Sequence, residues 1–333
     1  HMIKITRDAE LDIDDDLEKS FVEKISTSVS NRKISDPVRF VYDKRIKLDT
    51  LTFLKKKIDI ENTDSVIPGG RYHNRRDYMR FPNFGRSELQ YERIDPLPIA
   101  GFEMEGSLFD QIRKRDYLMY TPFQNYGYVI RFLKEAALDP KVKEIKITIY
   151  RLAKNSQVAA ALINAAKNGK KVTVQIELQA RFDEQSNIDY ANKFKEAGIN
   201  LIFGIRGLKV HSKICVITRE TKPRSLEYFG FISTGNFNES TAKIYTDYTL
   251  FTSHKGILTE VDKVFDFLTT TYRVKKYKHL IISPHYTEST FTRLIQQEIL
   301  NAKAGKSASI RIKMNSFTSY KMIDRLYQAS QAG

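Results

Sequence analysis

The most informative stretch of this sequence reads Gly207-Leu-Lys-Val-His-Ser-Lys-Ile-Cys-Val-Ile217. It places His211 and Lys213 two positions apart and continues into an apolar run typical of a buried strand. Because residues i and i+2 of a strand point to the same face, we expect the two side chains to project together. An imidazole nitrogen can attack phosphorus, and an ammonium beside it can hold the phosphoryl oxygens. The pair therefore favours phosphoryl chemistry.

Strand and helix patterns alternate around this stretch and predict an α/β domain within residues 106–280. The predicted helices cover 123–138, 158–166 and 188–197, and the predicted strands cover 145–149, 171–178 and 199–203. This alternation favours a parallel sheet, whose ligands bind at the carboxyl ends of the strands. Arg151, Arg181 and His211 follow one another at intervals of 30 residues, as successive βαβ units would place them. We therefore expect the three side chains to converge on one basic pocket.

Residues 3–60 alternate in the same way and predict a further α/β fragment. The predicted strands are 3–6 and 36–42, and the predicted helices are one that begins at the acidic run 12–16 and a short amphipathic one at 48–58. Residues 64–100 have no clear periodicity and end in Asp95-Pro-Leu-Pro98, a pattern typical of a linker.

A basic loop at 69–80 contains Arg71, Arg75 and Arg76. Charge runs are common on solvated surfaces, which is one interpretation of this loop. A contact with phosphate or with a partner is the other, and the sequence leaves both open.

The last part of the sequence contains a partial repeat of the α/β pattern. Ile310, Ile312 and Met314 repeat the strand pattern of 145–149, and residues 322–330 repeat the helix face of 158–166. The sequence stops where the first copy continues into its second strand. We therefore expect a second domain of the same kind that is cut off in the middle.

Composition limits the partners and the compartment. The 333 residues suggest two or three domains, and 41% apolar residues are sufficient for real cores. The 55 basic and 40 acidic residues give a net charge of +15, which favours a polyanionic partner. The single cysteine, Cys215, excludes an internal disulfide, fits a reducing compartment and is expected to be a buried hydrophobe. No signal peptide opens the sequence, no apolar run approaches the ~20 residues that span a bilayer, and His1-Met2 is typical of an expression remnant.

Each candidate site residue also has a structural interpretation. A lone histidine is more often structural, but Lys213, the two arginines and the turn Ser233-Thr-Gly-Asn-Phe-Asn238 favour catalysis by His211. Arginine offers phosphate two parallel hydrogen bonds, although Arg181 could instead pair with nearby carboxylates. Asn236 and Asn238 either form the turn alone or contact a phosphoryl oxygen or the histidine. The sequence contains neither a zinc-ligand spacing nor a P-loop.

Several consecutive motifs resemble one known family. They are Tyr150-Arg-Leu-Ala-Lys-Asn-Ser156, Glu177-Leu-Gln-Ala-Arg-Phe-Asp-Glu184, Gly207-Leu-Lys-Val-His-Ser-Lys213 and Thr234-Gly-Asn-Phe-Asn-Glu-Ser-Thr-Ala-Lys-Ile-Tyr-Thr-Asp247, with further blocks at Pro68-Gly-Gly-Arg-Tyr-His-Asn74 and Lys313-Met-Asn-Ser-Phe317. Together they resemble bacterial polyphosphate kinases of the larger, histidine-phosphorylated family. The His-x-Lys and Gly-x-x-Asn elements also resemble one half of a phospholipase D-type phosphoryl-transfer site.

The resemblance implies a fold and a domain division. It implies an α/β protein in which a phospholipase D-like catalytic domain follows part of an α/β head domain. Residues 1–104 would be the rear of the head domain, 105–280 the first phospholipase D-like domain, and 281–333 the truncated start of the second. The N-terminal domain and most of the second catalytic domain would then be missing.

The resemblance also implies roles for the site residues. His211 matches the phosphorylated nucleophile, with Lys213 beside it. Arg151 and Arg181 match arginines of the phosphate–magnesium site, and because guanidinium is not a metal ligand we interpret them as phosphate ligands beside Mg²⁺. Tyr245 matches a nucleotide contact, and Asn236 and Asn238 are expected to support the site.

The function implied is ATP–polyphosphate phosphotransfer through a phosphohistidine, in either direction. The expected cofactor is Mg²⁺, and the expected partners are ATP, ADP and inorganic polyphosphate rather than a specific nucleic acid. We also expect a homo-oligomer in the cytoplasm, at the inner face of the membrane, and this expectation comes from the resemblance alone. We expect this chain by itself to be inactive. Two alternatives stay open, namely a phospholipase D-type nuclease or phosphodiesterase and a non-catalytic polyanion-binding module.

Overall fold

The computed structural model describes residues 2–7, 36–60, 65–72, 78–79, 81–92, 94–178, 180, 184–205, 208–270 and 275–333. The chain divides into two compact units, His1–Ser253 and His254–Gly333. Some sequence predictions lie outside the described residues. These are the helix that begins at 12–16, the loop residues Arg75 and Arg76, and the site residue Arg181.

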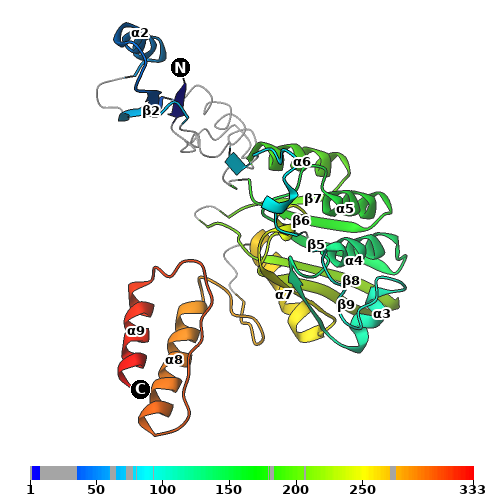
Figure 1. The fold of residues 1–333 in the computed structure, drawn as a ribbon. Helices are drawn as coiled ribbons and strands as arrows, with labels where there is room; N and C mark the ends of the chain where they lie inside the picture. The colour runs from blue at the N-terminus through cyan, green and yellow to red at the C-terminus, as the bar shows by residue number, and fades with distance from the viewer. Residues whose placement is uncertain are drawn as a thin grey trace. The chain divides into compact units, whose positions relative to one another are not determined.

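The first unit contains a seven-stranded sheet in the order β4-β10-β9-β8-β5-β6-β7 (Figure 1). Its strands are β4 Tyr117–Thr121, β5 Val142–Ile149, β6 Lys171–Ile176, β7 Asn200–Phe203, β8 Lys213–Lys222, β9 Ser225–Ser233 and β10 Asp247–Thr252. Strands β5, β6 and β7 are parallel, as predicted, but β8, β9, β10 and β4 pair antiparallel. The parallel prediction is therefore confirmed for β5, β6 and β7, and it does not extend to the other four strands of the sheet. Only Pro223 and Arg224 separate β8 from β9, and a two-residue connection can join only antiparallel strands.

Four helices contribute to one core with this sheet. They are α3 Leu108–Lys114, α4 Gly127–Leu138, α5 Gln157–Lys167 and α6 Glu184–Glu196. Alternate residues of β5, namely Ile145, Ile147 and Ile149, are fully buried in this core. The period of two in the sequence therefore identified the covered face of the sheet. The mixture of strands and helices confirms the predicted α/β class.

Helix ends differ from the sequence prediction where local turns intervene. Helix α4 begins at Gly127 rather than Phe123, because Gln124 N donates to Tyr120 O at 2.8 Å in a turn that follows β4. Helix α5 begins at Gln157, directly after its N-cap Ser156, whose hydroxyl accepts a hydrogen bond from Ala159 N. The sequence reading missed α3 and β4 altogether.

A small sheet precedes this domain in the chain. It consists of β1 Ile3–Arg7, β2 Pro37–Asp43 and β3 Ser65–Gly69, with β1 antiparallel and β3 parallel to β2. Helix α2, Leu48–Ile58, joins β2 to β3 and has the predicted bounds. Strand β3 lies in the interval 64–100, where no periodicity was visible. A short 3-10 helix, η2, follows at Ser87–Leu89.

The second unit is helical in the residues that the structure describes. Its helices are α7 Lys255–Thr269, α8 Thr287–Lys303 and α9 Tyr320–Gln331. Met322 of α9 is buried with Ile295 and Ile299 of α8, which agrees with the predicted helix face. No helix in the described part of the chain is long and apolar enough to cross a membrane.

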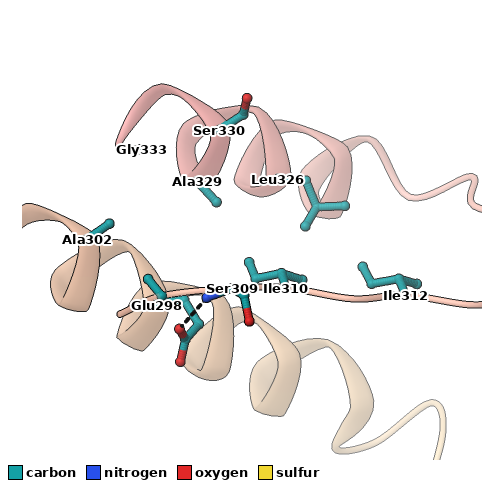
Figure 2. A pocket seen from close by; sticks show the side chains of 10 residues that line it. Glu298, Ala302, Ser309, Ile310, Ile312, Leu326, Ala329, Ser330 and Gly333 are labelled. Carbon is teal, nitrogen blue, oxygen red and sulfur yellow. Dashed lines mark hydrogen bonds between the residues drawn. The ribbon is translucent and has the colours of Figure 1, made fainter. Parts of the chain in front are cut away.

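The predicted strand at Ile310, Ile312 and Met314 does not form. Figure 2 shows this segment running extended between α8 and α9, where Ser309 N donates to Glu298 Oε2 at 3.1 Å. A groove of about 370 Å³ lies along it, lined by both helices. A strand needs a hydrogen-bonded neighbour, and the described residues of 254–333 include no other strand with which it could pair.

Candidate active site

Strand ends from both directions meet at one edge of the large sheet. Strands β5 and β9 end there, at Ile149 and Ser233. Strands β8 and β10 begin there, at Lys213 and Asp247, because β8 runs antiparallel to β5 and β10 antiparallel to β9. Segments that are far apart in the sequence therefore reach the same edge: the His211 loop, Arg151 and the turn 234–238.

His211 and Lys213 lie in direct contact at this edge. Lys213 is the first residue of β8, and its Nζ lies 2.9 Å from Nδ1 of His211. The ammonium also donates a hydrogen bond to the backbone carbonyl of His211. His211 itself is exposed, whereas only 5% of Lys213 is exposed. An accessible imidazole therefore lies against a buried cation.

The surroundings lower the pKa of both groups. Burial lowers the pKa of Lys213 to about 8, with a further contribution from the charge of Arg151, although Asp247 opposes the shift. Partial burial lowers the pKa of His211, and the positive charges of Lys213 and Arg151 lower it further. His211 is therefore neutral at physiological pH, which is the nucleophilic form of an imidazole.

The loop that carries His211 is hydrogen-bonded on both sides of the histidine. Before it, Val210 N donates to the carboxylate Oε2 of Glu177 at 3.3 Å. After it, the hydroxyl of Thr148 donates to Ser212 O at 2.7 Å and accepts a hydrogen bond from Ile214 N at 3.1 Å. Sequence reasoning assigned no role to Thr148 or Glu177. Their partners lie 33 to 66 residues away, and no local pattern reveals such pairs.

Arg151 follows the end of β5 and is half-buried. Fully buried Asn187 of α6 fixes this region, because its Nδ2 donates to Tyr150 O at 2.9 Å and to Glu177 O at 2.8 Å. One amide therefore joins the segments that follow β5 and β6. Arg181 lies outside the described residues, so its convergence with His211 stays a prediction.

The turn after β9 is built around the carboxylate of Asp247. Thr234 Oγ1 donates to Asp247 Oδ1 at 2.8 Å, and Gly235 N donates to Ser233 Oγ at 3.0 Å. A Cβ atom on Gly235 would come within 2.4 Å of Asp247 Oδ2. Glycine is therefore required at 235 because the carboxylate lies against its backbone. Asp247 was quoted in a sequence motif but given no role.

The two asparagines of this turn behave differently. Asn238 is buried, and its Oδ1 accepts hydrogen bonds from Ser240 N at 2.9 Å and Thr241 N at 3.1 Å. These bonds close the turn that leads into the 3-10 helix η3, Thr241–Lys243, so the turn-forming interpretation suits Asn238. In Asn236, by contrast, the buried Oδ1 has no hydrogen-bond partner among the residues that the structure describes. Tyr245 follows η3 and is 62% exposed.

The described residues offer little to a metal ion by themselves. Among them, no group of three His, Cys, Asp or Glu side chains could hold one. One carboxylate that reaches this edge is that of Asp247, at the start of β10, whose charge acts on Lys213. Mg²⁺ commonly binds one or two carboxylates together with substrate phosphates and water. The donors here therefore fit a magnesium ion that arrives on a phosphate-bearing substrate.

Comparison with known proteins identifies the family. The family model described as polyphosphate kinase C-terminal domain 1 matches residues 107–274, just over half of the chain and all of the site. The chain belongs to the polyphosphate kinase family. The polyphosphate kinase middle domain matches residues 1–81, and C-terminal domain 2 of the same family matches residues 280–333. The family predicted from the sequence motifs is confirmed.

Individual polyphosphate kinases match along the whole chain. The polyphosphate kinase of Vibrio vulnificus strain YJ016 is 44% identical over 333 residues, which cover 100% of this chain and 47% of that protein. The Escherichia coli K12 polyphosphate kinase is 41% identical over 335 residues. The crystal structure of polyphosphate kinase from Porphyromonas gingivalis is similar with a TM-score of 0.80 and 35% identity, covering 99% of this chain and 47% of that one. The chain therefore spans about half the length of the polyphosphate kinases that it matches.

Proposed function

We propose that the full-length protein transfers the γ-phosphoryl group of ATP to inorganic polyphosphate through a phosphohistidine at His211. The main support is the contact between the neutral, exposed imidazole of His211 and the buried ammonium of Lys213. The family supports the substrates, since the relatives are named polyphosphate kinases. The net charge of +15 also suits a long polyanion.

The first half-reaction forms the phosphohistidine. The lone pair of His211 Nε2 attacks the γ-phosphorus of ATP and forms an N–P bond. The bond from that phosphorus to the oxygen bridging to the β-phosphate breaks, and its electron pair leaves on ADP. In the second half-reaction, a terminal oxygen of polyphosphate attacks the phosphoryl group and the N–P electron pair returns to the imidazole. The reverse sequence makes ATP.

The remaining residues position phosphate and balance its charge. Lys213 and Arg151 supply positive charge beside the nucleophile, and we assign Arg181 the same role. We assign Asn236 to a phosphoryl oxygen, to which its Nδ2 would donate, while Asn238 shapes the turn. Tyr245 is assigned to the nucleotide because its exposed ring is free to stack on a base. Magnesium would enter with ATP, and when bound it would neutralise charge on the phosphates.

The domain division also belongs to this proposal. We assign residues 1–104 to the rear of the head domain, 105–280 to the first phospholipase D-like domain and 281–333 to the start of a second. Two catalytic domains would complete the nucleotide site together, so this chain alone should turn over ATP negligibly. A homo-oligomer at the inner face of the membrane in the cytoplasm is proposed from the family alone.

Product analysis of the full-length protein tests the proposed function. Incubation with Mg·ATP should yield ADP and acid-precipitable polyphosphate, and a Lys213→Ala variant should lose at least 99% of this activity. Lys209→Ala is the matched control, because Lys209 lies two residues before His211 and is exposed. Cleavage of a phosphodiester without polyphosphate would instead favour the phospholipase D-type alternative. Equal affinity for DNA and polyphosphate with no turnover would favour the polyanion-binding alternative.

A further inference from the structure

Three site groups surround the aromatic ring of Tyr150. The imidazole of His211 lies edge-on to it, with ring centroids 5.1 Å apart at an interplanar angle of 78°. Lys213 Nζ lies 5.5 Å from the ring centroid, and so does Cζ of Arg151. One ring therefore contacts the histidine and two cations.

The position of this ring is fixed from the backbone side. Tyr150 directly follows Ile149, the last residue of β5, and its carbonyl accepts the hydrogen bond from buried Asn187. Its hydroxyl makes no hydrogen bond to the residues that the structure describes. The ring face, rather than the hydroxyl, is therefore the part of Tyr150 that meets the site.

An aromatic face attracts cations through its quadrupole, more strongly when they are desolvated. Lys213 is such a cation, since it is buried and no carboxylate of the described residues lies within ion-pair distance of its Nζ. Among the described residues, the titratable and charged groups that act on it are His211, Arg151 and Asp247, and of these Asp247 is the anion. The ring of Tyr150 therefore offsets part of the repulsion between Lys213 and Arg151 before any phosphate has bound.

We propose that Tyr150 is a positioning residue of this site, whose ring face holds the ammonium of Lys213 against the imidazole of His211. The inference deepens the proposed function, because it rests on His211 as the nucleophile. Phosphoryl oxygens would replace the ring as partners of Lys213 when ATP binds. Tyr150 therefore keeps the empty site assembled and does not itself touch the reacting atoms.

The test compares Tyr150→Phe with Tyr150→Leu in the full-length protein. Competitive acetylation of lysines by acetic anhydride, followed across pH by mass spectrometry, reports the pKa of Lys213 directly. We expect Tyr150→Leu to lower the pKa of Lys213 by about half a unit to one unit, because the charged form loses the ring. Tyr150→Phe should leave it unchanged, and exposed Lys209 should be acetylated at the same rate in both variants.

A second readout is the rate at which γ-labelled ATP labels His211. We expect Tyr150→Leu to be about tenfold slower, with its alkaline limb moved to lower pH, and Tyr150→Phe to stay within about twofold of the parent. Tyr150→Met keeps most of the volume without an aromatic face and replaces the Leu variant if that one fails to fold.

Two results would overturn the inference. One is an unchanged pKa of Lys213 in the Leu or Met variant, and the other is a Phe variant as impaired as the Leu variant, which would assign the effect to the hydroxyl. If the parent protein never labels His211, the proposed function fails instead. The acetylation measurement needs no turnover, so it still decides whether the ring of Tyr150 supports Lys213.

Discussion

The Nζ atom of Lys213 lies 2.9 Å from Nδ1 of His211. An ammonium can only donate, so while Lys213 is charged, Nδ1 is the acceptor and the imidazole proton is on Nε2. Attack through Nε2 requires the other tautomer, with the proton on Nδ1. In the proposed mechanism, Lys213 would therefore release Nδ1 before His211 reacts, and an arriving phosphate would give the ammonium another partner.

Phosphorylation of His211 should depend on pH in a bell-shaped manner. Below the lowered pKa of His211 the imidazole is protonated and cannot attack, so the rate rises as pH increases through that value. Above a pH of about 8 Lys213 loses its charge, so the rate falls. Single-turnover labelling with γ-labelled ATP across pH measures both limbs. A Lys209→Ala variant should show the same fall in rate above pH 8. If the parent protein shows no fall in rate near pH 8, the role of Lys213 is contradicted.

Removal of one hydroxyl should loosen the His211 loop. Thr148→Val keeps the shape of the side chain but leaves Ser212 O and Ile214 N without their partner in the interior. We expect a loss of about 1–3 kcal/mol in the free energy of unfolding and slower labelling of His211. Thr173→Val in β6 is the control, because Thr173 is also buried but accepts only a long hydrogen bond of 3.5 Å from Asn200. Equal effects of the two substitutions on labelling would show that Thr148 does not position the loop.

Gly235→Ala should force Asp247 away from the turn. The added Cβ would lie 2.4 Å from the carboxylate, so we expect a destabilisation of about 1–3 kcal/mol in thermal or denaturant unfolding. A double-mutant cycle with Asp247→Gly isolates the clash, because that change removes Oδ2, Cγ and Cβ of residue 247, which would lie 2.4, 2.5 and 2.7 Å from the added Cβ. The Gly235→Ala substitution should therefore be better tolerated in the Asp247→Gly background. Additive effects of the two changes would mean that the carboxylate does not press on residue 235.

The two asparagines of the turn should separate stability from activity. Asn238→Ala removes a side-chain oxygen that accepts two backbone hydrogen bonds of the turn, so we expect about 1 kcal/mol less stability. Asn236→Ala removes no hydrogen bond within the turn and should leave the melting temperature unchanged, while labelling of His211 falls about a hundredfold. If Asn238→Ala instead slows labelling without loss of stability, and Asn236→Ala lowers stability, the proposed roles of the two residues are wrong.

Local sequence patterns predicted what local interactions determine. The bounds of α2 and the buried face of β5 follow from periodicity, and the contact of His211 with Lys213 follows from their spacing. The neighbours of that pair did not follow. Thr148 donates a hydrogen bond to Ser212, which lies 64 residues away in the sequence. Glycine is needed at 235 because the folded sheet brings the carboxylate of Asp247 against its backbone.

Strand pairing was the other limit. The apolar run of β8 is visible in the sequence. The direction of that strand in the sheet is not, because it depends on the pairing with β5 and β9. The alternation at 310–314 is as regular as that of β5, yet no strand forms there, because the described part of its unit provides no partner. Alternation shows which residues could share a face, whereas hydrogen-bonded neighbours decide whether a strand exists.

The most direct test of this account is covalent labelling of His211 in the full-length protein. After brief incubation with γ-labelled Mg·ATP, the label should be acid-labile and alkali-stable, and peptide mapping should place it on the segment containing His211. His211→Ala should abolish the label, whereas His285→Ala, a histidine of the second unit that packs against Phe267, should retain it. Undiminished labelling of the His211→Ala variant would contradict the account, because the phosphoryl group would then be carried by another residue.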